Sequence, residues 1–265
     1  MTICIAAIGK CEELENDDEA IVFATDHMIS LPMGQFEHSI EKYKKINSNT
    51  IAMLSGEALL FEDIIENASE LNSFDEIRDK IHQNMIEIKD YRINKWILDK
   101  FKINFDYLKQ LLMAPEHNDT VIEILDAIKK FNLQSSIILA GFKDNKAHIA
   151  EISEVGSTNA RDINFDAIGT GATQAINTLL FQRHSKNNNL KTTLYNVYKA
   201  KKNSEVAVGV GRETDIFILL KDGKIYKIND IQIQKLNEIY QNEMKFGKEH
   251  EELEEIINNL DEFDV

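Results

Sequence analysis

The second residue, Thr2, carries a side chain that could act as a nucleophile. A threonine hydroxyl attacks poorly near neutral pH unless a base lies at hydrogen-bond distance. If Met1 is removed, as aminopeptidases do ahead of small residues, the freed α-amine of Thr2 supplies that base, because its ordinary pKa is about 8. The hydroxyl would then attack a carbonyl carbon and form an ester that water hydrolyses. In the plainer interpretation, Thr2 is a β-branched residue that starts a strand.

Apolar strands would position this threonine. Residues 2–9 (TICIAAIG) and 20–26 (AIVFATD) are apolar runs on either side of an acidic stretch, and they predict a hairpin. A second hairpin is predicted from 135–144 and 147–153, around the turn DNK. The other predicted strands cover 38–46, 50–56, the segment NFDAIG before a glycine turn, and two strands within 204–228 that meet at Asp222-Gly223.

Helical periodicity fills the remaining segments. After Gly56, apolar residues such as Leu59 and Ile64 recur among charges, and this rhythm continues into a further helical region over about 93–131. The other predicted helices follow the GTG turn, lie near 191–204, and begin at about 231. Largely antiparallel strands beside helices indicate an α+β fold. The chain has two prolines and no low-complexity linker, so 1–265 is predicted to be a single domain.

Charge and composition argue against several classes of function. The 265 residues carry a formal charge of −15 at pH 7, whereas binding to nucleic acid needs a basic surface and so does binding to anionic membranes. Apolar runs are too short to span a bilayer, and no signal peptide is apparent. Cys4 and Cys11 lack metal-type spacing. These features predict a cytoplasmic protein without a metal or other cofactor.

Two further patterns have simple explanations. The segments GTGATQ and GVGRE lack the lysine and the spacing of phosphate-binding loops, so close backbone packing explains their glycines better. A metal site built from His27, His38 and Asp26 is conceivable, but the seven histidines lie far apart in sequence, and surface or structural roles are the simpler interpretation.

The order of the segments resembles the N-terminal-nucleophile (Ntn) hydrolase fold of proteasome β-subunits. TICIAAIG is similar to the family's threonine-initiated first strand, and IVFATDHMIS is similar to its second strand. The remaining likeness lies in KYKKINSNTIAMLSGEALL, AIGTGATQAINTLL and TDIFILLKDGKIYKI. The resemblance is greatest to bacterial and archaeal proteasome-like proteins that begin Met-Thr. It implies a four-layer αββα sandwich over about 2–228, with a helical insertion at about 93–131 and an acidic helical tail at about 231–265.

The resemblance assigns supporting roles to two charged residues. Lys42 matches the family lysine that favours the deprotonated forms of the nucleophile, and Asp26 matches the acidic residue that holds this lysine in place. Taken alone, Asp26 could be a turn residue, and a run of lysines is commonly a solvated strand face. Strand alternation puts Lys42 and Lys44 on one face. The four-residue spacing from Lys42 to Ile46 matches the pattern of the family that the chain resembles, which favours Lys42, and Lys44 stays open as the alternative.

Three more positions follow from the resemblance, two of them with departures from the family pattern. Met53 matches the glycine whose backbone N–H stabilises the oxyanion; the N–H is retained, but the side chain could narrow the substrate cleft. Thr170 matches a supporting serine and keeps a hydroxyl. Glu205 is the nearest match to a later aspartate, in a segment that aligns ambiguously.

The implied activity is that of a threonine peptidase that cleaves a peptide or protein substrate within a homo-oligomer, with any unfoldase partner unidentified. Two alternatives stay open. One is a structural or scaffold subunit that has lost activity, which Met53 and the ambiguous later aspartate favour. The other is an Ntn transpeptidase or ligase, in which an amine captures the same acyl-enzyme intermediate.

Overall fold

The computed structural model describes residues 2–11, 18–31, 34–38, 41–113, 119–160 and 162–246. It divides into two compact units, Met1–Lys227 and Ile228–Val265. The described part of the second unit contains the helix α7 (Asp230–Phe246), which agrees with the helical start predicted at about 231. The acidic segment predicted beyond it lies outside the described residues.

The first sheet of the larger unit, called the β1 sheet here, is antiparallel and has the strand order β10-β1-β2-β11-β12. Its strands are β1 (Ile3–Cys11), β2 (Asp18–Asp26), β10 (Phe165–Gly169), β11 (Thr214–Leu220) and β12 (Ile225–Lys227). The hairpin predicted from the first two apolar runs is confirmed, with Cys4 opposite Thr25 and Ile8 opposite Ile21.

The second sheet, called the β6 sheet, is also antiparallel and follows the order β5-β6-β7-β8-β9. Its strands are β5 (Tyr43–Asn47), β6 (Thr50–Ser55), β7 (Ser136–Lys143), β8 (Lys146–Ser153) and β9 (Gly156–Asn159). A short hairpin, β3 (Met28–Leu31) with β4 (Gly34–Glu37), follows β2. The predicted turn between β7 and β8 is confirmed, and Asp144 and Asn145 both have positive φ, as a two-residue hairpin turn requires.

The helices of the larger unit are α1 (Phe61–Ile65), α2 (Phe74–Trp96), α3 (Phe105–Leu112), α4 (Asp119–Lys130), α5 (Ala172–Phe181) and α6 (Leu190–Ser204), with short 3-10 turns η1 (Ala58–Leu60), η2 (Ala68–Glu70) and η3 (Leu98–Phe101). Ser73 and Glu76 form a capping box at the start of α2, which satisfies N–H groups that have no partner inside the helix. The residues near Pro115, where a helix break was predicted, lie outside the described residues.

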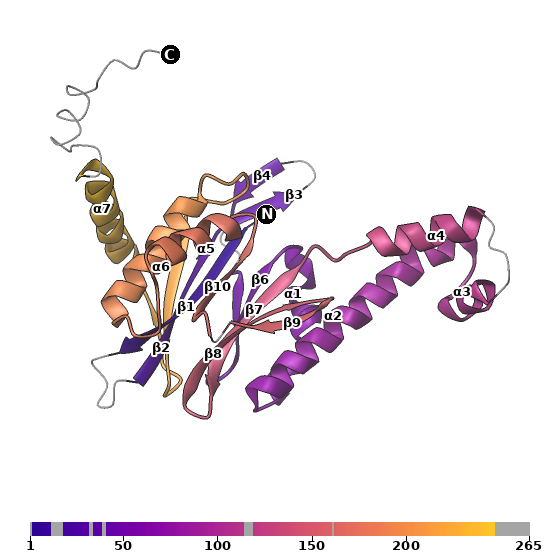
Figure 1. Ribbon diagram of the computed structural model, residues 1–265, viewed down its shortest axis with the longest axis horizontal. Helices are drawn as coiled ribbons and strands as arrows, with labels where there is room; N and C mark the ends of the chain where they lie inside the picture. The colour runs from indigo at the N-terminus through magenta and orange to yellow at the C-terminus, as the bar shows by residue number, and fades with distance from the viewer. Residues whose placement is uncertain are drawn as a thin grey trace, which may run out of the picture. The chain divides into compact units, whose positions relative to one another are not determined.

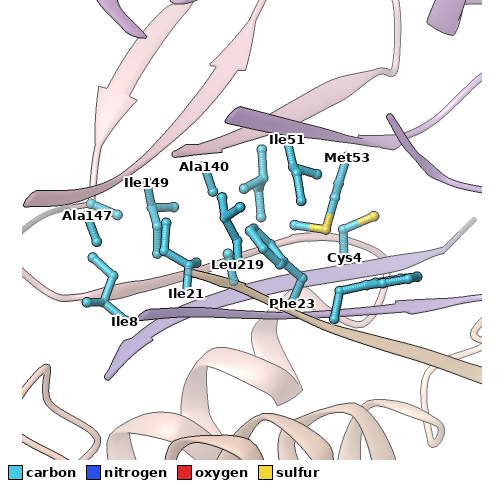
Figure 2. Close-up of a cluster of buried hydrophobic side chains, with 14 of the residues drawn as sticks. Cys4, Ile8, Ile21, Phe23, Ile51, Met53, Ala140, Ala147, Ile149 and Leu219 are labelled. Atoms are coloured by element: carbon cyan, nitrogen blue, oxygen red, sulfur yellow. The ribbon is translucent and has the colours of Figure 1, made fainter. Parts of the chain in front are cut away.

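One face of the β1 sheet packs against one face of the β6 sheet. Cys4, Ala6 and Ile8, alternate residues of β1, point into the layer between the sheets, and Met53 and Ile138 enter it from the opposite side. Figure 2 shows side chains of this cluster pointing toward one another from the two sheets. Alternation along each strand therefore decides which residues fill this inner core.

The outer faces of both sheets are covered by helices. Ala52 and Leu54, which alternate with Met53 in β6, pack in one cluster with Ile64 of α1 and Ile77 of α2. Helices α5 and α6 lie side by side against β1 and β2 (Figure 1). Burial of both faces explains why the first two strands are almost continuously apolar instead of alternating.

The helical insertion has a small core of its own. Ile93 at the end of α2, Leu98 in η3, Leu108 in α3 and Ile124 in α4 form a separate buried cluster. Phe131 packs against both this cluster and the cluster between α2 and the β6 sheet. The insertion is therefore connected to the rest of the unit mainly through α2 and this one aromatic residue.

The prediction that 204–213 begins a strand is wrong. The segment from Glu205 to Glu213 forms turns and loop, and β11 begins only at Thr214. The carbonyl groups of Gly211 and Arg212 accept hydrogen bonds from the Lys201 side chain instead of from a neighbouring strand, and Gly209 has a positive φ. A side-chain donor has thus replaced the backbone partners that a strand would need.

No helix within the described residues combines the length and the apolar composition needed to cross a bilayer.

Candidate active site

Thr2 lies immediately before β1, with 3% of its surface exposed. Strand β1 runs between β10 and β2, so both neighbours hold the backbone that follows Thr2. The Thr2 N–H donates to Thr170 Oγ1 at 3.3 Å, and the Thr170 hydroxyl contacts the Thr2 carbonyl oxygen at 3.4 Å. Thr170, the supporting residue chosen from the sequence, is thus placed against the backbone nitrogen of Thr2.

Asp26, the last residue of β2, lies with its carboxylate fully buried beside Thr2. Its Oδ1 accepts hydrogen bonds from the Thr2 hydroxyl and from the Ile3 N–H at 3.1 Å. Its Oδ2 accepts from the Gly211 N–H at 2.7 Å and from the Met28 N–H at 3.4 Å. Backbone N–H groups from three segments therefore fix both carboxylate oxygens, and a buried anion is stable only with such partners.

Lys42, just before β5, completes the group. Its side chain is 10% exposed, and its Nζ lies 2.6 Å from Asp26 Oδ1 and donates to the Thr2 hydroxyl. A third hydrogen bond goes to the Met28 carbonyl oxygen at 2.6 Å. The Leu54 N–H donates to the Lys42 carbonyl at 2.9 Å, which ties the lysine backbone to β6. Lys42 is thereby held on the Thr2 side of the β6 sheet.

The alternative lysine, Lys44, lies elsewhere. Its Nζ pairs with Glu62 of α1 and sits 5.9 Å from the centre of the Phe61 ring. The Lys44 and Glu62 side chains are 36% and 71% exposed. The structure therefore brings Lys42 to Thr2 and directs Lys44 toward the surface of α1.

Glycine makes the close approach of β10 to Thr2 possible. Gly169 has a φ of +104°, and a Cβ atom on this residue would lie 2.2 Å from the Thr2 carbonyl oxygen. Only glycine accepts both the positive φ and this distance without displacing Thr2. The sequence signal for this contact is the turn GTG: its middle residue, Thr170, is predicted to support the site, whereas its glycines are explained by close backbone packing.

Met53 lies in the middle of β6, opposite Tyr43 on one side and Ile138 on the other. Its side chain is fully buried in the layer between the sheets, as Figure 2 shows. Because N–H groups alternate along a strand and the Leu54 N–H faces Lys42, the Met53 N–H faces β7. Gly56, two residues after Leu54, is the first residue beyond β6 and has a φ of +128°.

Glu205 does not join the Thr2 group. Its carboxylate pairs with Lys201 at 2.6 Å and with Lys202 at 2.8 Å. The residue from this part of the chain that reaches the group is Gly211, through its N–H to Asp26. The sequence GVGRE does not indicate this role of Gly211, because every residue except proline has a backbone N–H and its use as a donor does not depend on the side chain.

A second polar cluster forms next to Asp26 in the sequence. His27 Nε2 lies 2.8 Å from Asp215 Oδ2, and Lys227 Nζ lies 2.8 Å from Asp215 Oδ1. Burial raises the pKa of Asp215, but hydrogen bonds from Lys227 and His27 outweigh it, so the pKa is lowered overall. Within the described residues no group of three or more His, Cys, Asp or Glu side chains could hold a metal ion. His27, named in the conceivable metal site, contacts Asp215 in this structure.

Cys4 lies two residues from Thr2 and faces the inner core. Its thiol donates to the Leu54 carbonyl at 3.4 Å. Burial raises the pKa of this thiol strongly, with smaller opposing effects of Lys42 and Asp26. Because the thiolate is the reactive form of cysteine, Cys4 stays a neutral core residue. The side chains of Lys42 and Asp26 both make hydrogen bonds to the Thr2 hydroxyl and not to this thiol.

The arrangement has the components of nucleophilic catalysis: a hydroxyl, a cation that polarises it, and an anion that fixes both. No protein-family model matches the chain, and no curated protein is significantly similar to it. Functional assignment accordingly rests on the geometry around Thr2.

Proposed function

We propose that this protein is an N-terminal threonine hydrolase of the proteasome-like Ntn type that cleaves peptide bonds. The observation that carries the proposal is the hydroxyl of Thr2, hydrogen-bonded to both Asp26 and Lys42 at the second position of the chain. Two face-to-face sheets with helices on both outer faces support the four-layer αββα arrangement of that family.

The first step would be activation of Thr2 by its own amine. Once Met1 is removed, the Thr2 nitrogen becomes a primary amine that can accept the hydroxyl proton directly or through one water. Thr170 Oγ1, now 3.3 Å from this nitrogen, would help to orient it. The Lys42 ammonium would stabilise the developing alkoxide, because a nearby cation favours the anionic form.

The second step would be attack of Thr2 Oγ1 on a substrate carbonyl carbon. The carbonyl π bond breaks, and the oxygen takes up negative charge. We assign the stabilising backbone donor to the Gly56 N–H in place of the Met53 N–H, because Gly56 follows the alternation of Leu54 toward Lys42. Donors of this kind typically contribute several kcal/mol, about 2.7–4, to the transition state. The Met53 side chain, buried between the sheets, leaves the substrate side free.

The third step would release the product amine and leave an ester on Thr2. Collapse of the tetrahedral intermediate breaks the C–N bond, and the protonated α-amine of Thr2 returns its proton to the leaving nitrogen. Water, deprotonated by the same amine, then cleaves the ester and regenerates the hydroxyl. An N-terminal amine therefore serves as base and acid in turn.

A structural subunit without activity is the second candidate. Thr2 is 3% exposed in the chain that carries Met1, and a retained methionine would keep its nitrogen an amide without basicity. We favour the enzyme because burying the Lys42 ammonium and the Asp26 carboxylate beside the Thr2 hydroxyl costs desolvation free energy. A residue that only begins a strand does not require these buried charges.

The test is covalent labelling of Thr2 by a threonine-directed epoxyketone, read by intact mass and peptide mapping. We expect a Met-free protein that gains one adduct at Thr2. The first control is Thr2→Ala, which should not be labelled. The second compares Lys42→Met with Lys44→Met, and only Lys42→Met should slow the labelling. A retained Met1, or equal labelling of Thr2→Ala, would reject the enzyme in favour of the structural subunit.

We also propose that the protein acts as a homo-oligomer on peptide or protein substrates, as the family resemblance implies. Sedimentation velocity at micromolar concentration measures the assembly state directly. A monomer that still labels at Thr2 would remove the oligomer from the proposal while leaving the catalytic residues in place.

A further inference from the structure

Lys201 of α6 is a fully buried charge that the proposed mechanism does not use. None of its side chain is exposed. Its Nζ donates to the carbonyl oxygens of Gly211 at 2.9 Å and Arg212 at 2.7 Å, and to Glu205 Oε1 at 2.6 Å. Burial lowers the pKa of Lys201, and the Glu205 carboxylate counteracts part of that effect. An ammonium at this depth costs free energy unless all its protons have acceptors, and here three oxygens supply them.

The residue whose carbonyl Lys201 binds is also the residue whose N–H contacts Asp26. The Gly211 carbonyl accepts from Lys201, while the Gly211 N–H donates to Asp26 Oδ2 at 2.7 Å. A Cβ atom on Gly211 would lie 2.7 Å from Glu37 Oε1 and 3.1 Å from the Met28 nitrogen, so a larger residue would have to displace the Glu37 side chain and press on the Met28 backbone. Lys201 is therefore separated from the Asp26 carboxylate by one residue of backbone.

The other side of this loop is fixed by Glu37. Its Oε1 accepts hydrogen bonds from the Arg212 N–H and from the Glu213 N–H at 3.1 Å. The loop 211–213 is thus held at its carbonyl groups by the Lys201 ammonium and at its N–H groups by the Glu37 carboxylate. Glu37 is exposed, whereas Lys201 is not, so the buried contact supplies the better-defined geometry.

We propose that Lys201 is a positioning residue for the Thr2 site: by binding the carbonyls of Gly211 and Arg212 it fixes the backbone of Gly211, so that the Gly211 N–H orients the Asp26 carboxylate. This inference rests on the proposed role of Thr2. With Oδ2 held by Gly211, Oδ1 stays directed at Thr2 and Lys42. Loss of the Lys201 contacts would free the loop and let the carboxylate turn, and small misplacements of reacting groups can cost about 100-fold in rate.

A simple ion pair with Glu205 would not explain this geometry. Lys202, one residue on, also pairs with Glu205 from a partly exposed position, at 2.8 Å. The chain therefore has a cation for Glu205 without burying Lys201. What Lys201 adds is its pair of bonds to the loop carbonyls.

The test compares Lys201→Met with Lys202→Met as the matched control, since both remove one cation from Glu205. Two measurements are made on each full-length variant. Hydrogen–deuterium exchange of peptides covering 205–213 reports the loop, and two-step epoxyketone kinetics report Thr2. We expect Lys201→Met alone to lose protection in this loop, and its maximal labelling rate to fall at least about tenfold with the inhibitor's initial binding constant unchanged.

Unchanged loop exchange, or a labelling rate within twofold of the Lys202→Met control, would overturn the inference. A fall in inhibitor binding equal to the fall in rate would also overturn it, because it indicates a generally loosened fold. If the wild type does not label at all, the proposed function and the positioning role both fail, whatever the loop exchange shows. If Lys201→Met does not fold, Lys201→Gln takes its place, with Lys202→Gln as its matched control. The shorter, neutral amide cannot replace the bonds of the ammonium to both the Gly211 and Arg212 carbonyls, so loop exchange identical to that of Lys202→Gln would refute the role.

Discussion

Removal of the Lys42 ammonium should destabilise the fold in a way that depends on Asp26. Lys42→Met keeps the length of the side chain but leaves the Asp26 carboxylate, which is fully buried, without its cation. Breaking a buried ion pair from one side typically costs about 3–5 kcal/mol. Asp26 keeps hydrogen bonds from the N–H groups of Ile3 and Gly211, so we expect the low end, about 3 kcal/mol of unfolding free energy.

Asp26→Asn removes the charge from the other side and leaves Lys42 with the Met28 carbonyl and the Thr2 hydroxyl. We again expect a loss of about 3 kcal/mol, by the same reasoning. In the double variant neither charge is left uncompensated, so its loss should be about 2–3 kcal/mol smaller than the sum of the single losses.

The assay is urea denaturation at pH 7 for the wild type, both single variants and the double variant. Lys44→Met, which breaks an exposed pair with Glu62, is the matched control and should cost less than about 1 kcal/mol. Single losses that add to within about 0.5 kcal/mol in the double variant would refute a coupled buried pair.

Three further predictions follow from residues near the site and in the core. Gly169→Ala should lower the unfolding free energy by more than about 1 kcal/mol and slow the labelling of Thr2. The reasons are that the added methyl group would clash with the Thr2 carbonyl oxygen and that Gly169 has a positive φ. Labelling at the wild-type rate would contradict this contact. Burial lowers the pKa of His184, and its bond to the Ile8 carbonyl partly opposes this. The neutral His184 therefore contributes its full stability above pH ~6.5, the ordinary histidine pKa that applies in the unfolded chain, and this contribution is lost as the pH falls through the lowered pKa of the folded protein. Between pH 7.5 and pH 5, the urea midpoint of His184→Gln should therefore fall less than that of the wild type. Asn84→Leu removes two buried hydrogen bonds, to the Ile64 and Glu66 carbonyls at 2.9 Å, and should cost about 2 kcal/mol by thermal or urea unfolding, whereas an unchanged midpoint would show that water replaces them.

Much of the sheet arrangement could be predicted because strand patterns are local. The runs around Ile5 and Phe23 are apolar on both faces, and the outcome is a pair of adjacent buried strands. The hairpin at Asp144 could likewise be predicted from turn chemistry. The helical insertion was predicted only as one long region, because its breaks depend on a separate small core around Leu98 and Leu108 that no local period reveals.

The parts of the site formed by side chains could be predicted from the sequence, whereas the parts formed by backbone N–H groups could not. Thr2, Asp26 and Lys42 have side chains of types that carry chemistry, and the structure brings them together. Gly211 contributes only an N–H. The backbone donor predicted at Met53 and the one proposed at Gly56 differ for the same reason: residue type does not mark a backbone N–H, and the end of β6 at Ser55 is known only from the structure.

The separate core of the helical insertion has a consequence for how the molecule opens. Clusters that share few side chains can unfold as distinct cooperative units, each with its own free energy. Among the described residues Phe131 is the one that packs against both clusters, so we expect η3, α3 and α4 to open more readily than the contacts of α2 with the β6 sheet. Sequence change in these helices would then be tolerated independently of the two sheets, so new surfaces could arise there without disturbing the geometry around Thr2.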